Sequence, residues 1–237
     1  MKLAVIPARG GSKRIPRKNI KHFCGKPMIA WSIEAAKNSG CFDVIMVSTD
    51  DEAIAEVARA HGATVPFMRP ASLADDYTGT IPAIRHAIQW FVEQGQAPDY
   101  VCCVYATAPF LLPKYLQDGM AAFAERDPQV DYAFSVTSYP FPIQRAIRVT
   151  EAGRVKMFNA EHFNTRSQDL EEAFHDAGQF YWGRAEAWSK GSMIFGPDST
   201  PVILPRYRVQ DIDTPEDWFR AELMFKALQA ESGVEVP

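Results

Sequence analysis

The most constraining feature of the sequence is the regular alternation of short apolar runs and helical patterns through the first 137 residues. Parallel strands need a crossover connection, usually a helix, so this alternation predicts a mainly parallel sheet covered by helices. Right-handed crossovers then place all strand-to-helix loops at one edge of the sheet, where ligands bind. The expected strands are 3–7, 44–47, 64–67, 101–105 and 132–136, and the expected helices are 27–40, 49–62, 80–93 and 113–125.

The alternation stops after Thr137. Residues 138–178 carry prolines, aromatic residues and mixed charge without a helical period, which predicts a β-rich insertion that leaves the sheet. An apolar patch on such an insertion favours a subunit interface, so we expect a homodimer. Strands are expected again at 180–182, 202–204 and 209–212. The last helix is expected to begin with Thr214 as its cap and to end near Ala230. A chain of 237 residues fits one α/β domain with this insert.

A basic loop follows the first strand. Between Arg9 and Lys26 there is no acidic residue, although the whole chain has a net charge of −4. Gly10 and Gly11 allow the backbone to approach an anion closely. The position directly after the first strand favours a di- or triphosphate site over a solvated loop. No Walker A or G-x-G-x-x-G pattern is present. The seven basic residues are Arg9, Lys13, Arg14, Arg17, Lys18, Lys21 and Lys26.

Two carboxylates separated by a single apolar residue lie near the C-terminus. In an extended segment Asp211 and Asp213 share one face, about 6.6 Å apart, while Ile212 points into a core. Such a pair suits Mg²⁺, which takes one or two carboxylates together with phosphate oxygens. The same residues precede a helix, so a capping cluster explains them equally well. Combined with the basic loop, they indicate chemistry on a nucleoside triphosphate.

Composition excludes several classes of protein. An acidic chain with a pI near 5.8 argues against a nucleic-acid-binding protein. No apolar run reaches 18 residues, so we expect no membrane span. The four cysteines, at positions 24, 41, 102 and 103, form no C-x-x-C pair and favour core residues of a reducing compartment. We therefore expect a cytoplasmic protein.

Ordered motifs along almost the whole chain resemble those of the CMP-sialic acid synthetase family, the cytidylyltransferases of nine-carbon acidic sugars. The motifs are IPARGGSKRIPRKNI, VSTDDEAIAEVA, RPASLADDYT, YATAPFL, FNTRSQDLEEAFHDAGQFYW and QDIDTPEDW. Their forms are similar to those of the branch that uses pseudaminic acid. The resemblance implies a Rossmann-like three-layer α/β/α nucleotide-diphospho-sugar transferase fold with a projecting dimerisation insert. It implies transfer of CMP from CTP to the anomeric hydroxyl of the sugar, with Mg²⁺ as cofactor and release of pyrophosphate.

The resemblance also assigns residues to the nucleotide and to the metal. Lys18 is the expected transition-state cation, with Arg9 as its competitor. Asp211 and Asp213 match the metal-binding carboxylates, and Asp211 is the expected group that orients or deprotonates the sugar hydroxyl. The positions that match nucleotide-binding residues are Arg9, Ser12, Lys13, Lys18, Asn19, Arg69 and Thr80.

At the sugar end the sequence departs from the enzymes of sialic acid. Tyr105 occupies the place of a glutamine, and a phenol cannot replace the paired donor and acceptor of an amide. This favours a more hydrophobic, 9-deoxy sugar over N-acetylneuraminic acid. Arg166 matches an arginine near the sugar carboxylate, with Gln168 and Tyr181 beside it.

Several alternatives stay open at this point. A related enzyme would use legionaminic, N-acetylneuraminic or 3-deoxy-octulosonic acid. A sugar-1-phosphate or molybdopterin nucleotidyltransferase would share the fold, although FNTRSQDL argues against it. A non-catalytic nucleotide-binding protein would not need the carboxylate pair. At Asp75 and Asp76 the sequence favours a turn over a role in the functional site.

Overall fold

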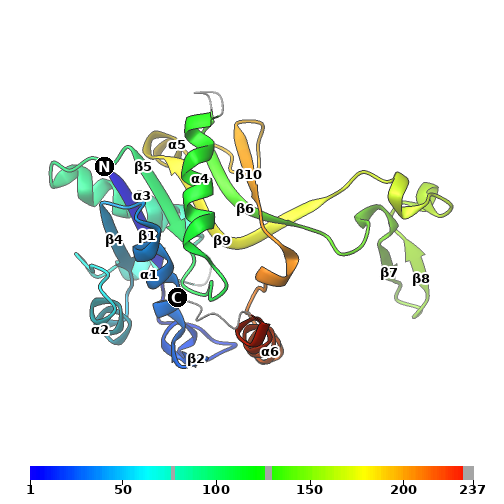
Figure 1. Cartoon of the computed structure of the whole chain (residues 1–237), viewed down its shortest axis with the longest axis horizontal. Coiled ribbons are helices and arrows are strands. Elements are labelled where there is room, and N and C mark those ends of the chain that lie inside the picture. Colours follow the sequence, from blue (N-terminus) through cyan, green and yellow to red (C-terminus); the bar gives the residue numbers. More distant parts are fainter. Residues whose placement is uncertain (76–77, 126–129, 232–237) are drawn as a thin grey trace.

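The computed structural model describes residues 1–75, 78–125 and 130–231 and contains a central six-stranded sheet (Figure 1). The strand order is β10-β6-β9-β5-β1-β4. β1 (Lys2–Pro7) lies parallel between β4 (Val44–Ser48) and β5 (Tyr100–Val104). β9 (Phe174–Arg184) runs antiparallel to β5 and β6 (Tyr132–Ser138), and β10 (Ser199–Ile203) is parallel to β6. The sheet is thus mainly parallel, as the alternating pattern predicts.

Helices cover both faces of the sheet. On one face α1 (Met28–Ser39), α2 (Glu52–Ala60) and α4 (Pro113–Glu125) pack on the strands, and on the other α3 (Thr80–Glu93) and α5 (Ala185–Lys190) do so. The adjacent Cys102 and Cys103 are both fully buried and belong to opposite cores. Strands buried on both faces explain the continuous apolar runs of the sequence. The predicted three-layer α/β/α arrangement is confirmed.

Close packing joins α4 to the sheet. Gly119 on α4 faces Trp182 and Phe180, and a Cβ atom at this position would lie 2.6 Å from Cδ1 of Trp182. The indole Nε1 of Trp182 donates a hydrogen bond to the carbonyl of Leu116 at 3.0 Å. The indole also stacks on Phe42, with ring centroids 4.8 Å apart. Gly119 is therefore required by the contact between helix and sheet.

A third core lies beside the basic loop. Ile15 and Phe23 from the loop region pack with Trp218 and Phe225 of α6 (Pro215–Glu231) and with the fully buried Ile212. A short two-stranded sheet of β2 (His22–Phe23) and β3 (Lys26–Pro27) completes this region. The C-terminal helix therefore holds the basic loop against the body of the protein. The 3-10 turns are Lys18–Ile20, Ala71–Leu73, Ile143–Arg145, Ala160–His162, Ser167–Asp169 and Arg206–Arg208.

Three local predictions were wrong. Residues 64–67 form only isolated bridges, Met46 with Thr64 and Thr49 with Met68, instead of a strand. Residues 209–212 are not a strand either. The helix expected over 49–62 begins only at Glu52, after Asp51 as its cap, whose carboxylate accepts the Ile54 N–H at 3.0 Å. Short apolar runs do not reveal whether a neighbouring strand offers a full hydrogen-bonding edge.

The cap of the last helix is confirmed. The Thr214 hydroxyl accepts the Asp217 N–H at 3.2 Å, and the Asp217 carboxylate accepts the Thr214 N–H at 2.8 Å. This reciprocal pair is a capping box. It holds the end of the segment that carries Asp211 and Asp213.

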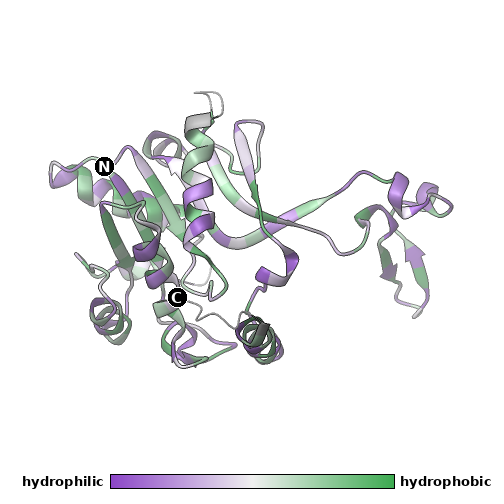
Figure 2. Ribbon diagram, viewed as in Figure 1, coloured by the Kyte–Doolittle hydropathy of each residue, from purple (hydrophilic) through white to green (hydrophobic). Residues whose placement is uncertain are grey.

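Residues 139–173, here called the projection, extend away from the sheet on the ends of β6 and β9 (Figure 1). Their only strands among the described residues are β7 (Ile147–Val149) and β8 (Val155–Met157), which pair with each other. The projection carries many apolar side chains that are exposed in the single chain, and its ribbon alternates between hydrophobic and hydrophilic stretches (Figure 2). These are Tyr139, Phe141, Ile143, Ile147, Val149, Val155, Phe158 and Phe163.

Candidate functional site

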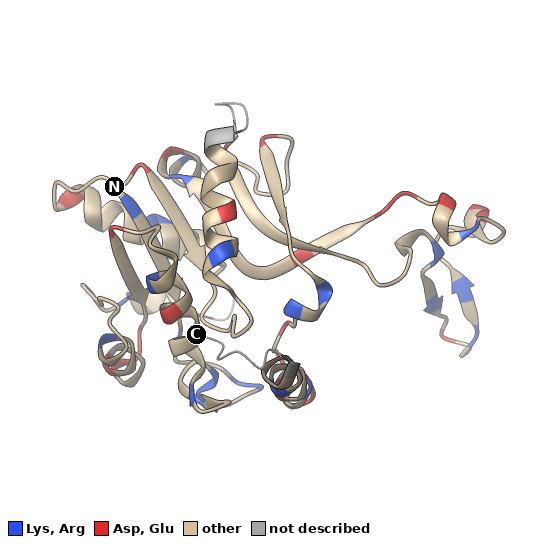
Figure 3. Ribbon diagram, in the orientation of Figure 1, with Lys and Arg blue, Asp and Glu red and all other residues tan. Residues whose placement is uncertain are grey.

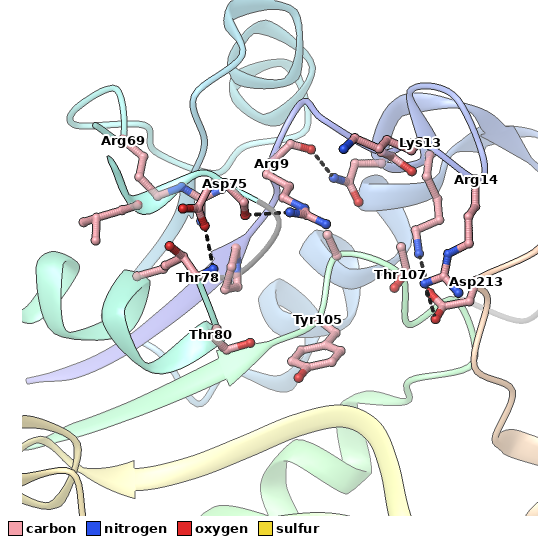
Figure 4. A pocket seen from close by; sticks show the side chains of 18 residues that line it. Arg9, Lys13, Arg14, Arg69, Asp75, Thr78, Thr80, Tyr105, Thr107 and Asp213 are labelled. Atoms are coloured by element: carbon pink, nitrogen blue, oxygen red, sulfur yellow. Dashed lines mark hydrogen bonds and ion pairs between the residues drawn. The ribbon is translucent and has the colours of Figure 1, made fainter. Parts of the chain in front are cut away.

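A cavity of about 490 Å³ opens at the carboxyl ends of β1 and β5 (Figure 4). Its walls come from the loop after β1, from residues 69–83, from Tyr105–Thr107 after β5, and from Asp213. This is the edge at which the parallel topology predicts a ligand site. The volume suits a small-molecule ligand. The cavity brings together nine predicted site residues: Arg9, Ser12, Lys13, Lys18, Asn19, Arg69, Thr80, Tyr105 and Asp213.

Side chains within the basic loop fix its shape. The Asn19 amide donates to the carbonyl of Arg9 at 3.0 Å, and the Ser12 hydroxyl donates to the carbonyl of Ile15 at 2.6 Å. Arg17 has a left-handed backbone with φ of 52° and leads into the turn that carries Lys18. Ile15 is anchored in the core under α6. The loop is therefore ordered against the protein, as a preformed anion site requires.

The seven basic residues of the loop do not all reach the cavity. Arg17 pairs with Asp51 at 3.1 Å, and Lys21 lies 4.2 Å from the ring centroid of Trp218. Lys26 pairs with an acid on α1. The cationic side chains of the loop that line the cavity are Arg9, Lys13, Arg14 and Lys18. A charge run in sequence thus overstates the positive charge of the site.

Asp213, one of two aspartates among the residues that line the cavity, faces two of these cations. Its Oδ1 lies 3.2 Å from Nζ of Lys18, and its Oδ2 lies 2.7 Å from Nη2 of Arg14. Lys18 also donates to the carbonyl of Ile212 at 2.6 Å. The prediction that Ile212 points into a core is confirmed, since it is fully buried. Lys18 is therefore held between the loop and the C-terminal segment.

Asp211 lies at the margin of this arrangement. It is exposed and is not among the residues that line the cavity. Its pKa is raised above the ordinary value, first because nearby protein atoms displace water from its carboxylate and then because Asp213 repels its charge, while Lys18 acts in the opposite direction. Asp211 and Asp213 therefore interact electrostatically, although the segment between them is not a strand.

The donor set suits a metal shared with a ligand rather than a metal held by protein alone. Among the described residues no group of three or more His, Cys, Asp or Glu side chains is placed to hold a metal ion. Mg²⁺ commonly takes one or two carboxylates and completes its shell with phosphate oxygens and water. Two repelling carboxylates beside a basic loop fit this arrangement.

Arg69 lies on the opposite wall of the cavity. Its side chain is 5% exposed and lies 3.7 Å from Oδ1 of Asp50, which also accepts the N–H of Gly10 at 3.0 Å. Burial lowers the pKa of Arg69, and the neighbouring Asp50 opposes this effect. Asp50 thus connects the basic loop to the wall that carries Arg69.

A turn before α3 completes this wall (Figure 4). The guanidinium of Arg9 donates to the carbonyl of Asp75 at 2.6 Å, and the Asp75 carboxylate accepts the Thr78 N–H at 2.6 Å. Asp75, where the sequence favours a turn over a role in the site, lines the cavity. Asp76 lies outside the described residues. Thr80, the first residue of α3, follows directly.

Tyr105 forms the far end of the cavity. Behind it lies the buried Tyr181, with the two ring centroids 5.4 Å apart. Thr80 lines the cavity together with Tyr105 (Figure 4). Burial raises the pKa of both phenols, so both remain protonated at neutral pH. Tyr181 is therefore placed to support Tyr105.

Arg166 and Gln168 are not brought to this cavity in the same chain. Both are exposed on the projection, and Arg166 pairs with Asp169 at 2.7 Å. The projection leads away from the sheet (Figure 1), and none of its described residues lines the cavity. Basic residues also recur on its β7–β8 hairpin, at Arg148 and Lys156 (Figure 3). A role for Arg166 at the sugar carboxylate would therefore require the cavity of another copy.

Some lining residues were not singled out by the sequence. Thr78, Gly79 and Thr107 line the cavity through loops whose path depends on tertiary packing. Arg14 was counted in the basic run, but its pairing with Asp213 joins segments 199 residues apart and leaves no local signal.

Comparison with known proteins identifies the relatives of this chain. Residues 3–227 match the family model described as cytidylyltransferase. The chain is 49% identical over 224 residues to a pseudaminic acid cytidylyltransferase of Campylobacter jejuni, covering 94% of this chain and 96% of that protein. It is 31% identical to the CMP-N,N'-diacetyllegionaminic acid synthase of Legionella pneumophila, covering 96% of this chain and 97% of that protein.

A solved structure shares the fold. It is the CMP:2-keto-3-deoxy-manno-octonic acid synthetase complexed with CTP, which aligns over 98% of this chain and 99% of its own. The TM-score is 0.68 and the sequence identity 17%. The similarity confirms the expected architecture of a nucleotidyltransferase.

Proposed function

Because this chain belongs to the cytidylyltransferase family, we propose that it transfers CMP from CTP to the anomeric hydroxyl of pseudaminic acid, giving CMP-pseudaminic acid and pyrophosphate. One structural observation carries the proposal: a preformed basic loop, a carboxylate and a phenol-lined end face each other across one cavity. This arrangement separates a place for phosphates from a place for a less polar ligand. The names of the relatives that cover most of this chain support the choice of substrates.

The reaction forms a bond between the sugar oxygen and the α-phosphorus of CTP and breaks the bond to the β-phosphate. The sugar hydroxyl loses its proton and pyrophosphate leaves. We assign Lys18 and Arg9 to the phosphates, where fixed cations stabilise charge that develops in the transition state. Ser12, Lys13 and Asn19 bind or shape the loop around the triphosphate, and Arg69 and Thr80 bind the rest of the nucleotide.

We propose that Asp211 and Asp213 hold Mg²⁺ together with the nucleotide phosphates. When bound, the ion neutralises charge on the triphosphate and on the departing pyrophosphate. Asp213 is paired with Lys18 and Arg14, so the same carboxylate also positions the two cations. Asp211 is our candidate for the group that orients the sugar hydroxyl or receives its proton.

At the sugar end we assign Tyr105, with Tyr181 behind it. A phenol offers an apolar ring and one hydroxyl, which suits a deoxygenated end of the sugar better than an additional hydroxyl would. N-acylneuraminate cytidylyltransferase A of Danio rerio is 34% identical to this chain. The match covers 92% of this chain but only 49% of that protein. A related acidic sugar is therefore the second candidate substrate.

We also propose that the protein is a homodimer assembled through the projection. An isolated two-stranded hairpin is marginally stable in water, yet β7 and β8 pair only with each other among the described residues. Phe141, Phe158 and Phe163 are 78%, 63% and 68% exposed in the single chain. A second copy would cover these side chains and could bring Arg166 and Gln168 to a neighbouring cavity. Four free cysteines fit a cytoplasmic enzyme.

None of the helices in the described parts of the chain has the length and apolar character to span a membrane.

The proposed reaction is tested by pyrophosphate release with CTP and Mg²⁺, offering pseudaminic acid and N-acetylneuraminic acid in parallel. Release with pseudaminic acid alone supports the reaction and the choice of sugar. Release with N-acetylneuraminic acid alone contradicts the role given to Tyr105, and release with neither contradicts the proposed function.

A further inference from the structure

The two oxygens of the Asp213 carboxylate are held by two cations that differ in how firmly they are fixed. Oδ1 lies 3.2 Å from Nζ of Lys18, whose amine also donates to the Ile212 carbonyl at 2.6 Å and whose side chain is 18% exposed. Oδ2 accepts a hydrogen bond from Nη2 of Arg14 at 2.7 Å, and the Arg14 side chain is 65% exposed. Within the described residues Lys18 thus has two acceptors, whereas Arg14 has Asp213 alone.

Asp213 is held in place without the help of Arg14. Its backbone N–H donates to Oδ2 of Asp217 at 3.1 Å, next to the capping box of α6. The residue before it, Ile212, is fully buried, and Lys18 fixes Oδ1. Exposed ion pairs contribute little to the stability of a fold. Support of the fold therefore does not explain why Arg14 is paired with this carboxylate.

Arg14 occupies the oxygen of Asp213 that a metal ion could reach at the smaller cost. A guanidinium is always charged and has only donors, so it competes with a metal for the same oxygen and repels an ion that binds there. To displace Lys18 would also break the bond to the Ile212 carbonyl. To displace Arg14 breaks one exposed ion pair.

A displaced Arg14 would remain at the same cavity. It lines this cavity together with Arg9, Lys13 and Lys18 (Figure 4), where we place the triphosphate. The planar fork of a guanidinium matches two phosphate oxygens. Because the side chain is long and exposed, it can turn from Asp213 to a phosphate without any change in the core.

We propose that Arg14 is an internal counter-ion of Asp213 that exchanges this carboxylate for phosphate oxygens of the nucleotide when the metal binds. Arg14 then joins the entry of the metal to that of the nucleotide, because the carboxylate is released only as the phosphates take up the guanidinium. The inference rests on the proposed function, since it requires a nucleotide phosphate and a metal at Asp213.

Binding of Mn²⁺ to the nucleotide-free protein tests the competition at Asp213. Mn²⁺ has the charge of Mg²⁺ and suits the same oxygen ligands, and electron paramagnetic resonance separates free from bound ion. Arg14→Gln should lower the Kd of Mn²⁺ about fivefold, the scale of one exposed ion pair that no longer has to be broken. Asp213→Asn should raise this Kd, because it removes a charged ligand.

Binding of CTP tests the other half of the exchange. Without the sugar no transfer occurs, so calorimetry at saturating Mg²⁺ measures the Kd of CTP itself. Arg14→Gln should raise this Kd about fivefold, since a charge-assisted hydrogen bond to phosphate is lost, while the earlier release of Asp213 offsets part of the loss. The exchange thus predicts tighter metal binding and weaker nucleotide binding in one variant.

Arg17→Gln is the matched control. Arg17 lies in the same loop, pairs with Asp51 at 3.1 Å and is not among the residues that line the cavity. It should change either Kd by less than about twofold, because a charge that far from the site is screened. Changes in Arg17→Gln as large as those in Arg14→Gln would mean that only the net charge of the loop matters, and would overturn the inference.

The Mn²⁺ titrations also separate this inference from the metal assignment on which it rests. If Asp213→Asn weakens Mn²⁺ binding but Arg14→Gln leaves it unchanged or weakens it, Arg14 only braces Asp213, and the inference alone is overturned. If Asp213→Asn leaves Mn²⁺ binding unchanged, the metal assignment of the proposed function fails and the inference fails with it. Pyrophosphate release by the wild type decides the proposed reaction separately.

Discussion

The substitution Lys18→Met tests the central electrostatic assignment of the site. Methionine keeps most of the length and flexibility of the lysine side chain and removes its charge. The Lys18 amine is held by the Ile212 carbonyl at 2.6 Å and by Asp213 at 3.2 Å, and the side chain is only 18% exposed. Its charge is therefore fixed before the nucleotide binds, which is the condition for strong stabilisation of a transition state.

The expected loss follows from this geometry. Removal of one preorganised group that faces developing charge costs about 10²–10³-fold in kcat, or about 2.7–4 kcal/mol. Both kcat and kcat/KM should fall by this factor, with the KM for CTP little changed, because the interaction is made mainly in the transition state. The fold should lose only about 1–2 kcal/mol, from the unpaired Ile212 carbonyl and the weaker contact with Asp213.

A matched control removes the same charge from the same loop. Lys21 is three residues away, but its amine lies over the Trp218 ring and is not among the residues that line the cavity. Lys21→Met should lose about 0.5–1 kcal/mol of stability from the cation–π contact and keep kcat within about twofold. Pyrophosphate release gives the kinetic constants, and urea unfolding gives the stability of each variant.

Two results would refute the reasoning. A kcat of Lys18→Met within about threefold of wild type would remove Lys18 from the transition state and favour Arg9. Equal losses in Lys18→Met and Lys21→Met would mean that the net charge of the loop matters and that the position of the amine does not.

Three further results are expected. Gly119→Ala should lower the free energy of unfolding by about 1–3 kcal/mol despite the better helix propensity of alanine, because the new methyl group would overlap Trp182. Thermal unfolding checks this, and a stabilised variant would contradict the packing described here. Asp211→Ala should remove most turnover while the melting temperature is kept, and near-normal turnover would contradict its assignment to the metal. The wild type should scatter light as a dimer at micromolar concentration, whereas Phe158→Asp should shift it toward monomer, and an unchanged mass would contradict assembly through the projection.

The main elements of the fold could be predicted because their signals are local. The helix predicted at 80–93 and that predicted at 113–125 have the bounds of α3 and α4. The run around Cys102 and Cys103 reads as a buried strand because both faces are apolar. By contrast, residues 64–67 and 209–212 have strand-like composition but do not pair along their length with a neighbouring strand. Whether such a partner strand is present depends on the assembled sheet and not on the local sequence.

The site could be predicted in part for the same reason. The loop that carries Lys18 follows β1, so topology alone places this loop at the ligand edge. Arg69 follows 64–67, which form only isolated bridges, so its place depends on tertiary packing. The role of Asp213 as the partner of Lys18 and Arg14 depends on α6 packing over the loop, a contact between the two ends of the chain. The separation of Arg166 from the cavity depends on the direction of the projection, which no local pattern encodes.

The strand β9 has a consequence for how such a protein changes over generations. Its first residues, around Asp176, lie at the base of the projection, and its later residues, including Tyr181, lie in the centre of the sheet. Because one continuous strand serves both places, a substitution that shifts β9 changes the base of the projection and the wall of the cavity together. We therefore expect substitutions along β9 to be accompanied by compensating substitutions, so that the projection and the cavity wall diverge together among descendants of a common ancestor.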